Sequence, residues 1–255
     1  MRASATPALL VASILAAAAM LSGLVGPAAA QIGIPSFGVP VTEDFNTLAG
    51  SGTSSTLPAG WAFAETGANA NLLYTAGTGS STTGDTYSFG AAGSGERALG
   101  GLRSSSLVPY IGAALRNDTG GVIARLDIAF TGEQWRLGAT PRIQPDRIFF
   151  EYSLNATSLT TGAWTAVTAL DFLSPITSGV VGTLDGNAAA NRTAVAGSVT
   201  GILLAPTAVL WIRWSDFDVT SSDDGLAIDD LSITASEGPV PTVPTTLGGL
   251  KGAYR

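Results

Sequence analysis

The chain has 255 residues, of which none is cysteine and none is histidine. Disulfides, histidine-ligated zinc and the Ser-His-Asp and Cys-His catalytic arrangements are therefore excluded, and any metal bound by side chains would be a hard cation that prefers oxygen. Twelve Lys and Arg residues stand against 19 Asp and Glu residues, and Lys251 is the only lysine. No basic patch is available to neutralise phosphates, so direct binding of nucleic acid is not expected.

Residues 1–30 are predicted to be a secretory signal peptide. A basic residue precedes an apolar run over 8–20, and the small residues Ala28 and Ala30 stand just before the expected cleavage site. The apolar run is short for a bilayer span. We therefore expect a protein that is secreted or held at the cell surface, and whose mature chain starts with a short N-terminal linker at 31–38.

Residues 39–235 are predicted to form one β domain. Apolar and polar residues alternate clearly over 122–136, 147–154 and 208–216, as expected of strands. Turn-rich stretches separate the weaker strand candidates, which are 61–66, 72–76, 86–89, 108–115, 163–167 and 199–204. Many short strands without an amphipathic helix predict an all-β fold, an antiparallel two-sheet sandwich of the jelly-roll type, concanavalin-like or galactose-binding-like. A parallel β-helix is the alternative.

Residues 236–255 are predicted to be a Pro-rich C-terminal tail. Pro239, Pro241 and Pro244 suit an extended linker. The tail is too short and too polar to anchor the chain, so no membrane span is expected once the signal peptide is removed.

Two tryptophans next to charged residues are candidates for ligand binding. Glu133 and Trp135 fall on the polar face of their predicted strand, and Trp211 and Arg213 fall on the polar face of theirs. A partly exposed tryptophan flanked by charged groups offers a platform for a sugar ring, with apolar area and a few polar contacts that fix orientation. The alternative is that these tryptophans cover the outer face of a sheet beneath loops.

The stretch "LAIDDLSI" (226–233) places an acid on a face meant for a core. In a regular strand Asp229 shares one face with Leu231 and Ile233, while Asp230 lies on the other. If Leu231 and Ile233 point into the sandwich, so does Asp229. A buried carboxylate is costly unless it is paired, hydrogen-bonded or bound to a metal.

The same test applied to "VPVTEDFNTL" (39–48) places Glu43 on the face of Phe45 and Asp44 opposite. The first and last strands would then each send one acid inward, and two neighbouring buried carboxylates need a shared proton or a cation such as Ca²⁺ between them. The alternative is that Asp229 is hydrogen-bonded to backbone N–H groups or paired with an arginine, without a metal.

Asp223 and Asp224, which precede this strand, are assigned to a solvated turn. No paired acids at alternating positions, as in sandwich glycosidases, occur near the lone Glu151, so catalysis is not expected.

The segments "EDFNTL…LPAGWAF" (43–63) and "DDGLAIDDLSI" (223–233) resemble the opening and closing strands of secreted jelly-roll modules of the carbohydrate-binding and MAM-like kind. The resemblance implies a structural calcium held by Glu43 or Asp44 and by Asp229 or Asp230. The middle of the chain, 86–187, resembles a domain of exported bacterial surface proteins that also occurs as a non-catalytic attachment in some extracellular nucleases.

These observations together predict a secreted, non-catalytic β-sandwich that binds or adheres to an extracellular glycan or surface polymer. A structural cell-surface or matrix protein without a small ligand is the first alternative. A glycoside hydrolase is the second.

Overall fold

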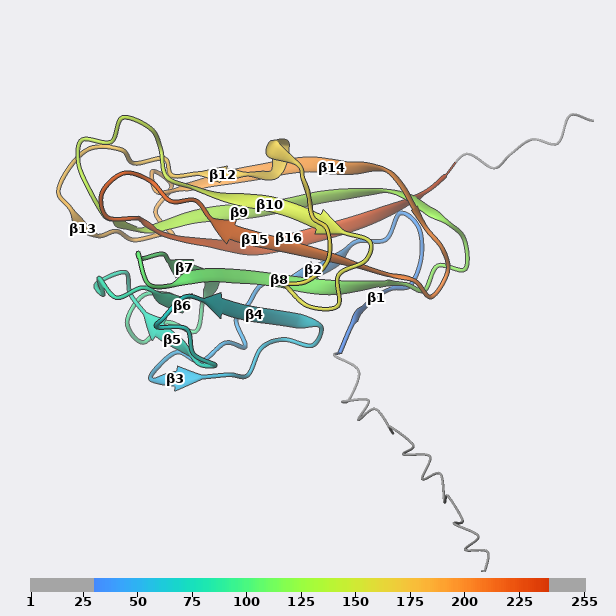
Figure 1. The fold of residues 1–255 in the computed structure, drawn as a ribbon, viewed down its shortest axis with the longest axis horizontal. Coiled ribbons are helices and arrows are strands. Elements are labelled where there is room, and N and C mark those ends of the chain that lie inside the picture. Colours follow the sequence, from blue (N-terminus) through green and yellow to red (C-terminus); the bar gives the residue numbers. More distant parts are fainter. Residues whose placement is uncertain (1–29, 239–255) are drawn as a thin grey trace, which may run out of the picture.

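Two β-sheets pack face to face in the computed structural model of the protein, which describes residues 30–238 (Figure 1). Residues 1–29 of the predicted signal peptide and residues 239–255 of the predicted tail lie outside this described part. Between residues 30 and 238, no helix is long and apolar enough to cross a membrane.

The strands divide between a sheet of seven and a sheet of nine. The seven-stranded sheet contains β1 (Ile32–Ile34), β4 (Trp61–Thr66), β8 (Val108–Asn117), β10 (Arg147–Ser153), β11 (Thr165–Ala166), β12 (Phe172–Leu173) and β15 (Val209–Asp216). The nine-stranded sheet contains β2 (Val41–Glu43), β3 (Thr53–Ser54), β5 (Tyr74–Gly77), β6 (Asp85–Phe89), β7 (Ala98–Leu102), β9 (Ile123–Leu137), β13 (Gly182–Thr183), β14 (Arg192–Leu204) and β16 (Gly225–Glu237). A short 3₁₀ helix, η1, spans Thr168–Leu170.

The strand order confirms the predicted all-β sandwich. The central order is β8-β15-β10 in one sheet and β9-β16-β7-β6-β5 in the other, and the chain crosses from sheet to sheet at each step from β7 to β10 and from β14 to β16, as in jelly rolls. The clearest predicted strands correspond to β9, β10 and β15. One detail differs from the prediction: β1 pairs with β8, and β5 with β6, in parallel, so both sheets are mixed.

Alternating side chains of β9 build the core between the sheets. Leu126, Ile128 and Phe130 of β9 are buried there. Across from them, the indole of Trp214 on β15 meets the ring of Phe130 edge-on at 5.3 Å and that of Phe150 on β10 at 5.1 Å, measured between ring centroids. Aromatic pairs in this geometry bury a large apolar area and fix the distance between the two sheets.

Residues 31–38 are not the linker that the sequence suggested. Ile34 of β1 is fully buried in the main core, and the Phe37 ring packs against it. β1 adds to the edge of β8 beside β4, which pairs with an earlier part of the same strand. The apolar side chains of this segment are removed from water when they pack against the sandwich. This burial favours the packed position over an extended linker.

A β-bulge in β16 overturns the predicted orientation of Asp229. The pairing with β9 shifts between Asp229 and Ser232, and Asp230 at the shift has a φ of 49°. A bulge adds one residue to one strand, so the alternation of faces is reset across it. Ile228 before the bulge and Leu231 after it therefore both point into the core. Asp229 instead lies on the outer face of the nine-stranded sheet, which it shares with Ala227.

Candidate functional site

Glu133 and Trp135 lie on the outer face of the nine-stranded sheet but are not exposed. Trp135 is 1% exposed, stacks on the ring of Phe89 at 6.0 Å, and donates its indole N–H to Glu133 Oε2 at 2.9 Å. The loop before β14 covers the indole so closely that a Cβ added to Gly186 would lie 2.3 Å from the ring. The alternative interpretation, a tryptophan covered by a loop, describes this position.

Trp211 and Arg213 lie on the outer face of the other sheet. Trp211 is 7% exposed and packs in a small cluster with Leu159. Arg213 forms an ion pair with Glu151 at 2.7 Å, and its guanidinium lies 3.9 Å from the centroid of the Trp164 ring. The four predicted ligand-binding residues are thus divided between opposite outer faces, and no exposed platform brings them together.

The predicted calcium ligands are divided as well. Glu43, Asp44 and Asp230 line an open hollow of about 420 Å³ where β2 pairs with β16. Glu43 Oε1 accepts a hydrogen bond from the backbone N–H of Phe45, and Asp44 makes the equivalent local bond to Asn46. Burial raises the pKa of Glu43 from its ordinary value. Asp229 does not line this hollow, because the bulge turns it to the other side.

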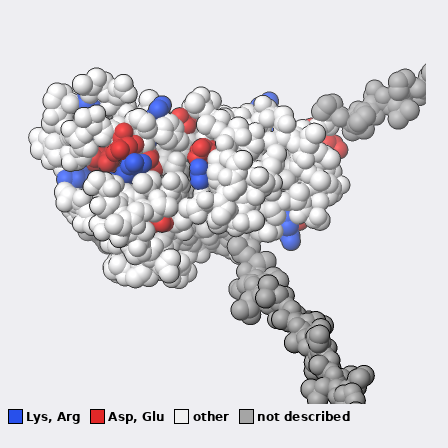
Figure 2. All heavy atoms as spheres, viewed as in Figure 1, with Lys and Arg blue, Asp and Glu red and all other residues white. Residues whose placement is uncertain are grey.

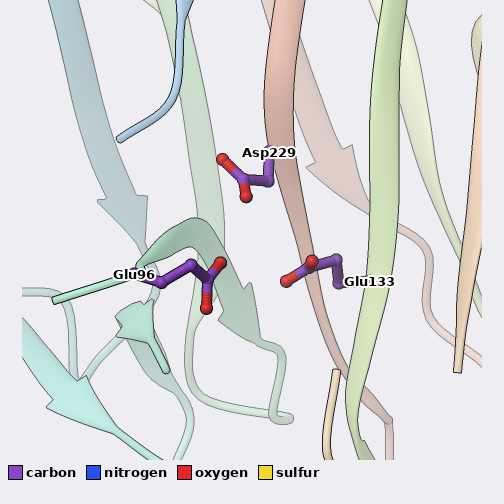
Figure 3. Close-up of side chains that lie close together, drawn as sticks. All are labelled: Glu96, Glu133 and Asp229. Carbon is purple, nitrogen blue, oxygen red and sulfur yellow. The ribbon is translucent and has the colours of Figure 1, made fainter. Parts of the chain in front are cut away.

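Asp229 instead meets Glu96 and Glu133, and Figure 3 shows the three carboxylates converging. Each contributes an oxygen to a group whose members lie within 4.8 Å of one another. Glu133 comes from β9, Asp229 from β16, and Glu96 from the loop just before β7. We call these three residues the Asp229 cluster.

The electrostatics of the Asp229 cluster require a positive charge or a proton. Glu96 Oε1, Glu133 Oε1 and Asp229 Oδ1 are buried and have no hydrogen-bond partner within residues 30–238. Burial, reinforced by the neighbouring carboxylates, raises the pKa of Glu133 to about 7 and that of Asp229 to about 8. Unpartnered oxygens that converge in a buried place suit a hard cation, because they offer the ligands that calcium prefers.

The sequence pattern gave little sign of Glu96. It stands in the glycine-rich stretch "GAAGSGERALGG" (90–101), whose composition is typical of a turn rather than of a binding site. Its contact with Glu133 and Asp229 links residues that are 37 and 133 positions away along the chain (133 − 96 and 229 − 96), and no local period reports such a distance. Glu133 was singled out, but as a ligand-binding residue beside Trp135.

A second carboxylate group lies at the end of the sandwich and contains Asp146, Asp216 and Asp223, which we call the Asp216 cluster. Figure 2 shows acidic side chains gathered with basic ones at the end where the β15–β16 loop lies. Asp223 is 6% exposed, and its neighbour Asp224 is fully buried. The assignment of both to a solvated turn is therefore wrong: both are buried, and the Asp224 carboxylate accepts hydrogen bonds from Gln134, Gly138 and Arg142.

The same end of the molecule has a hollow of about 380 Å³ between two loops, 139–144 and 217–221. We call it the end hollow. Its wall includes the half-buried ring of Phe217, which meets Phe149 edge-on at 5.3 Å and lies 4.8 Å from the guanidinium of Arg147. The side chain of Asp218 beside it is 69% exposed. The end hollow thus combines a fixed aromatic ring with accessible polar groups.

No protein-family model matches the chain, and no curated protein matches it. Among solved structures, the chain is similar to TmCBM61 in complex with β-1,4-galactotriose, at 10% identity over 68% of this chain and 88% of that one, with a TM-score of 0.34. It is also similar to the xylan-binding module CBM15, at 11% identity over 78% and 97% of the chains, with a TM-score of 0.33.

A third similar structure is the K1 cleaved adhesin domain of Lys-gingipain from Porphyromonas gingivalis W83, at 15% identity over 78% of this chain and 99% of that one, with a TM-score of 0.33. The assignment of the sandwich itself rests on the strand pairing of this chain.

Proposed function

We propose that the protein is a secreted, non-catalytic β-sandwich that binds an extracellular glycan in the end hollow. The observation that carries this proposal is the hollow itself, which combines a volume of about 380 Å³ with the half-buried ring of Phe217 and polar side chains. Ligand sites of small molecules are commonly concave, about 300–1,000 Å³ in size, and mix apolar walls with a few polar groups.

The chemistry of the end hollow suits a sugar. The ring of Phe217 packs against Phe149 and Arg147. Because the side chain is already ordered, little conformational entropy is lost when a ligand binds to it. A sugar ring presents an apolar face that packs on an aromatic ring and hydroxyls that need acceptors and donors. The carboxylate of Asp218 and the hydroxyl groups of Thr220 and Ser221 line the same hollow and supply them.

The non-catalytic part of the proposal rests on burial. Glycosidases need two carboxyl groups about 5–10 Å apart on either side of a substrate. Five of the six carboxylates in the two convergent groups of the described chain, those of Asp146, Asp216, Asp223, Glu133 and Asp229, are at most 6% exposed, and the sixth, Glu96, is half-buried. A glycosidic bond has no access to them. Export follows from the predicted signal peptide and belongs to the same proposal.

A glycan array probed with the mature chain, 31–255, tests the proposal. We expect wild type to bind at least one glycan class, and Phe217→Ala to bind it at least tenfold more weakly, because the aromatic wall is lost. Trp164→Ala is the matched control, since it removes an aromatic residue from the outer face of the seven-stranded sheet and leaves the end hollow unchanged.

Other outcomes would contradict the proposal in distinct ways. Loss of binding in Trp164→Ala alone would move the site to that outer face, near Arg213. Absence of binding to any glycan would favour the structural surface or matrix protein. New reducing ends released from a bound glycan would show a hydrolase.

We also propose that the Asp229 cluster holds a structural calcium ion. The residues fit the ion: three carboxylates converge, and each has a buried oxygen that no donor satisfies within the described chain. The bound ion would supply the positive charge that lets Glu133 and Asp229 stay ionised. It would tie β9, β16 and the loop before β7 together. Glu43, a ligand in the sequence prediction, is not part of this set.

Thermal unfolding with calcium and with chelator tests the calcium site. At 100 times its Kd, an ion that binds only the folded state adds about 2.7 kcal/mol, which raises the midpoint of a domain of this size by about 5–10 °C. We expect Asp229→Asn to reduce the calcium-induced shift and Glu43→Gln to leave it at the wild-type value. An equal shift in Asp229→Asn and wild type, or no shift in wild type, would rule out the site.

A further inference from the structure

The Asp216 cluster shares no residue with the Asp229 cluster and lies at the end of the sandwich. Asp146 lies just before β10, Asp216 ends β15, and Asp223 lies just before β16. All three side chains are more than nine-tenths buried, and one oxygen of each lies within 4.8 Å of the others. Three carboxylates thus meet where two strands start and a third ends.

The outer nitrogens of the two neighbouring arginines are closest to other groups, and Arg103 Nε is buried without a hydrogen-bond partner in the described chain. Arg142 Nη2 lies 2.5 Å from Asp224 Oδ1 but 3.8 Å from Asp146 Oδ2. Arg103 donates from Nη1 to the backbone carbonyl of Asp216 at 3.0 Å, and its Nη2 lies 3.5 Å from the exposed carboxylate of Asp218. Neither guanidinium therefore forms a close ion pair with the three clustered carboxylates.

Hydrogen bonds from the backbone account for some of the carboxylate oxygens. Asp146 accepts from the N–H groups of Arg147 and Asp224, and Asp223 Oδ1 accepts from that of Val219. These bonds fix where the carboxylates point.

Asp216 is the member with a free oxygen. Its Oδ2 accepts from the N–H of Arg103 at 3.2 Å, whereas its Oδ1 is buried and has no partner anywhere in the described chain. Burial and the mutual repulsion of the acids raise the pKa of Asp146 to about 7 and that of Asp216 well above its ordinary value. The fold holds these acids together against their repulsion.

We propose that Asp146, Asp216 and Asp223 bind a second calcium ion. Oxygens within 4.8 Å of one another can share an ion at the 2.3–2.6 Å distances of calcium ligands, because two ligands on opposite sides of an ion are about twice that distance apart. The chain has no cysteine or histidine, so the site offers only oxygen ligands. An all-oxygen site favours a hard cation over the softer transition metals. Backbone carbonyls and water complete the coordination.

The position of this ion has a consequence for the end hollow. Asp146 ends the segment that contains the 139–144 loop, and Asp216 and Asp223 flank the 217–221 loop. An ion between them fixes both loops that line the hollow. Glycan binding in the hollow is then calcium-dependent, a consequence that rests on the proposed function, whereas the ion site itself does not.

Counting bound ions tests the site without any glycan. The mature chain is stripped with chelator and titrated with calcium by calorimetry, and native mass spectrometry gives the stoichiometry. We expect two ions in wild type, one in Asp216→Asn/Asp223→Asn and one in Asp229→Asn. Two ions in the double variant, or none in Asp229→Asn, would overturn the second site.

The Asp229→Asn arm keeps the test decisive if the double variant does not fold, because it leaves the Asp216 cluster intact. We expect the double variant to fold, since asparagine has the shape of aspartate and removes the repulsion; its unfolding midpoint in chelator equals or exceeds that of wild type. Two bound ions without glycan binding would refute the proposed function and leave the site. Calcium-independent glycan binding with one bound ion would support the proposed function and refute the second calcium site.

Discussion

The neighbouring residues Asp229 and Asp230 of β16 differ in role because of one backbone angle. Asp230 has a φ of 49°, in the left-handed region, where a short polar residue is tolerated better than a branched one. The bulge at this residue exposes Asp230 and turns the Asp229 carboxylate toward Glu133. Burial then raises the pKa of both Asp229 and Glu133. A local backbone feature therefore creates a titratable pair.

This pair predicts an unusual pH dependence in the calcium-free protein. The pKa values of about 7 for Glu133 and about 8 for Asp229 lie above those of the unfolded chain, so the folded state binds more protons. Its free energy of unfolding therefore falls as pH rises from about 4 to 8. Glu133→Gln removes one titrating group, and we expect it to be more stable than wild type at pH 8 by on the order of 1–3 kcal/mol.

Urea unfolding in chelator at pH 5 and pH 8 measures this difference. Asp185→Asn, at an acid in the loop before β14, is the control and keeps the wild-type dependence. A wild-type protein whose stability rises from pH 5 to pH 8 in chelator would contradict the assignment. Calcium should flatten the wild-type curve, because it competes with the proton for the same oxygens.

At the scale of elements, short edge strands matter more than their length suggests. β1 has three residues, yet it pairs with β8 and places Ile34 in the main core. β2 likewise covers β16 beyond the end of β7. These strands extend the two sheets further along the long central strands, where unpaired edges would otherwise face water.

Ile34→Ala tests the contribution of β1. The side chain is fully buried, so we expect a loss of about 2–5 kcal/mol in the free energy of unfolding, from lost burial and the cavity that remains. Leu203→Ala, at a residue of β14 that is 79% exposed, is the control and should change it by less than about 0.5 kcal/mol. An equally small effect of Ile34→Ala would mean that 31–38 acts as a linker. Urea unfolding at a fixed calcium concentration provides the measurement.

At the scale of the molecule, the fold has no disulfide and compensates with covered faces. The main core, which contains Trp214, fills the space between the sheets, while Trp135 is buried on one outer face and Trp211 on the other. The formal net charge is −7, and buried carboxylates concentrate part of it at two places along β16. Cations at those places would act as the cross-links that cysteine does not supply.

The strands and the sandwich followed from the sequence because alternation is local. A period of two is visible in β9, β10 and β15 without knowledge of any partner strand, and turn residues mark where each strand ends. The same local pattern separated Glu133 and Trp135 from the core face of β9. It also identified Asp229 as an acid in need of a partner.

The partner itself was decided only by the tertiary structure. Parity assigned Glu43 to Asp229, but a bulge resets parity and gives no clear sign in the letters, so Asp229 meets Glu96 and Glu133 instead. Asp146 and Asp223 lie in two loops and Asp216 lies at the end of β15, and their approach depends on how both sheets twist and pack. Carboxylates that are distant in sequence meet through long-range packing, and a single sequence records the residues of that packing but not their distances.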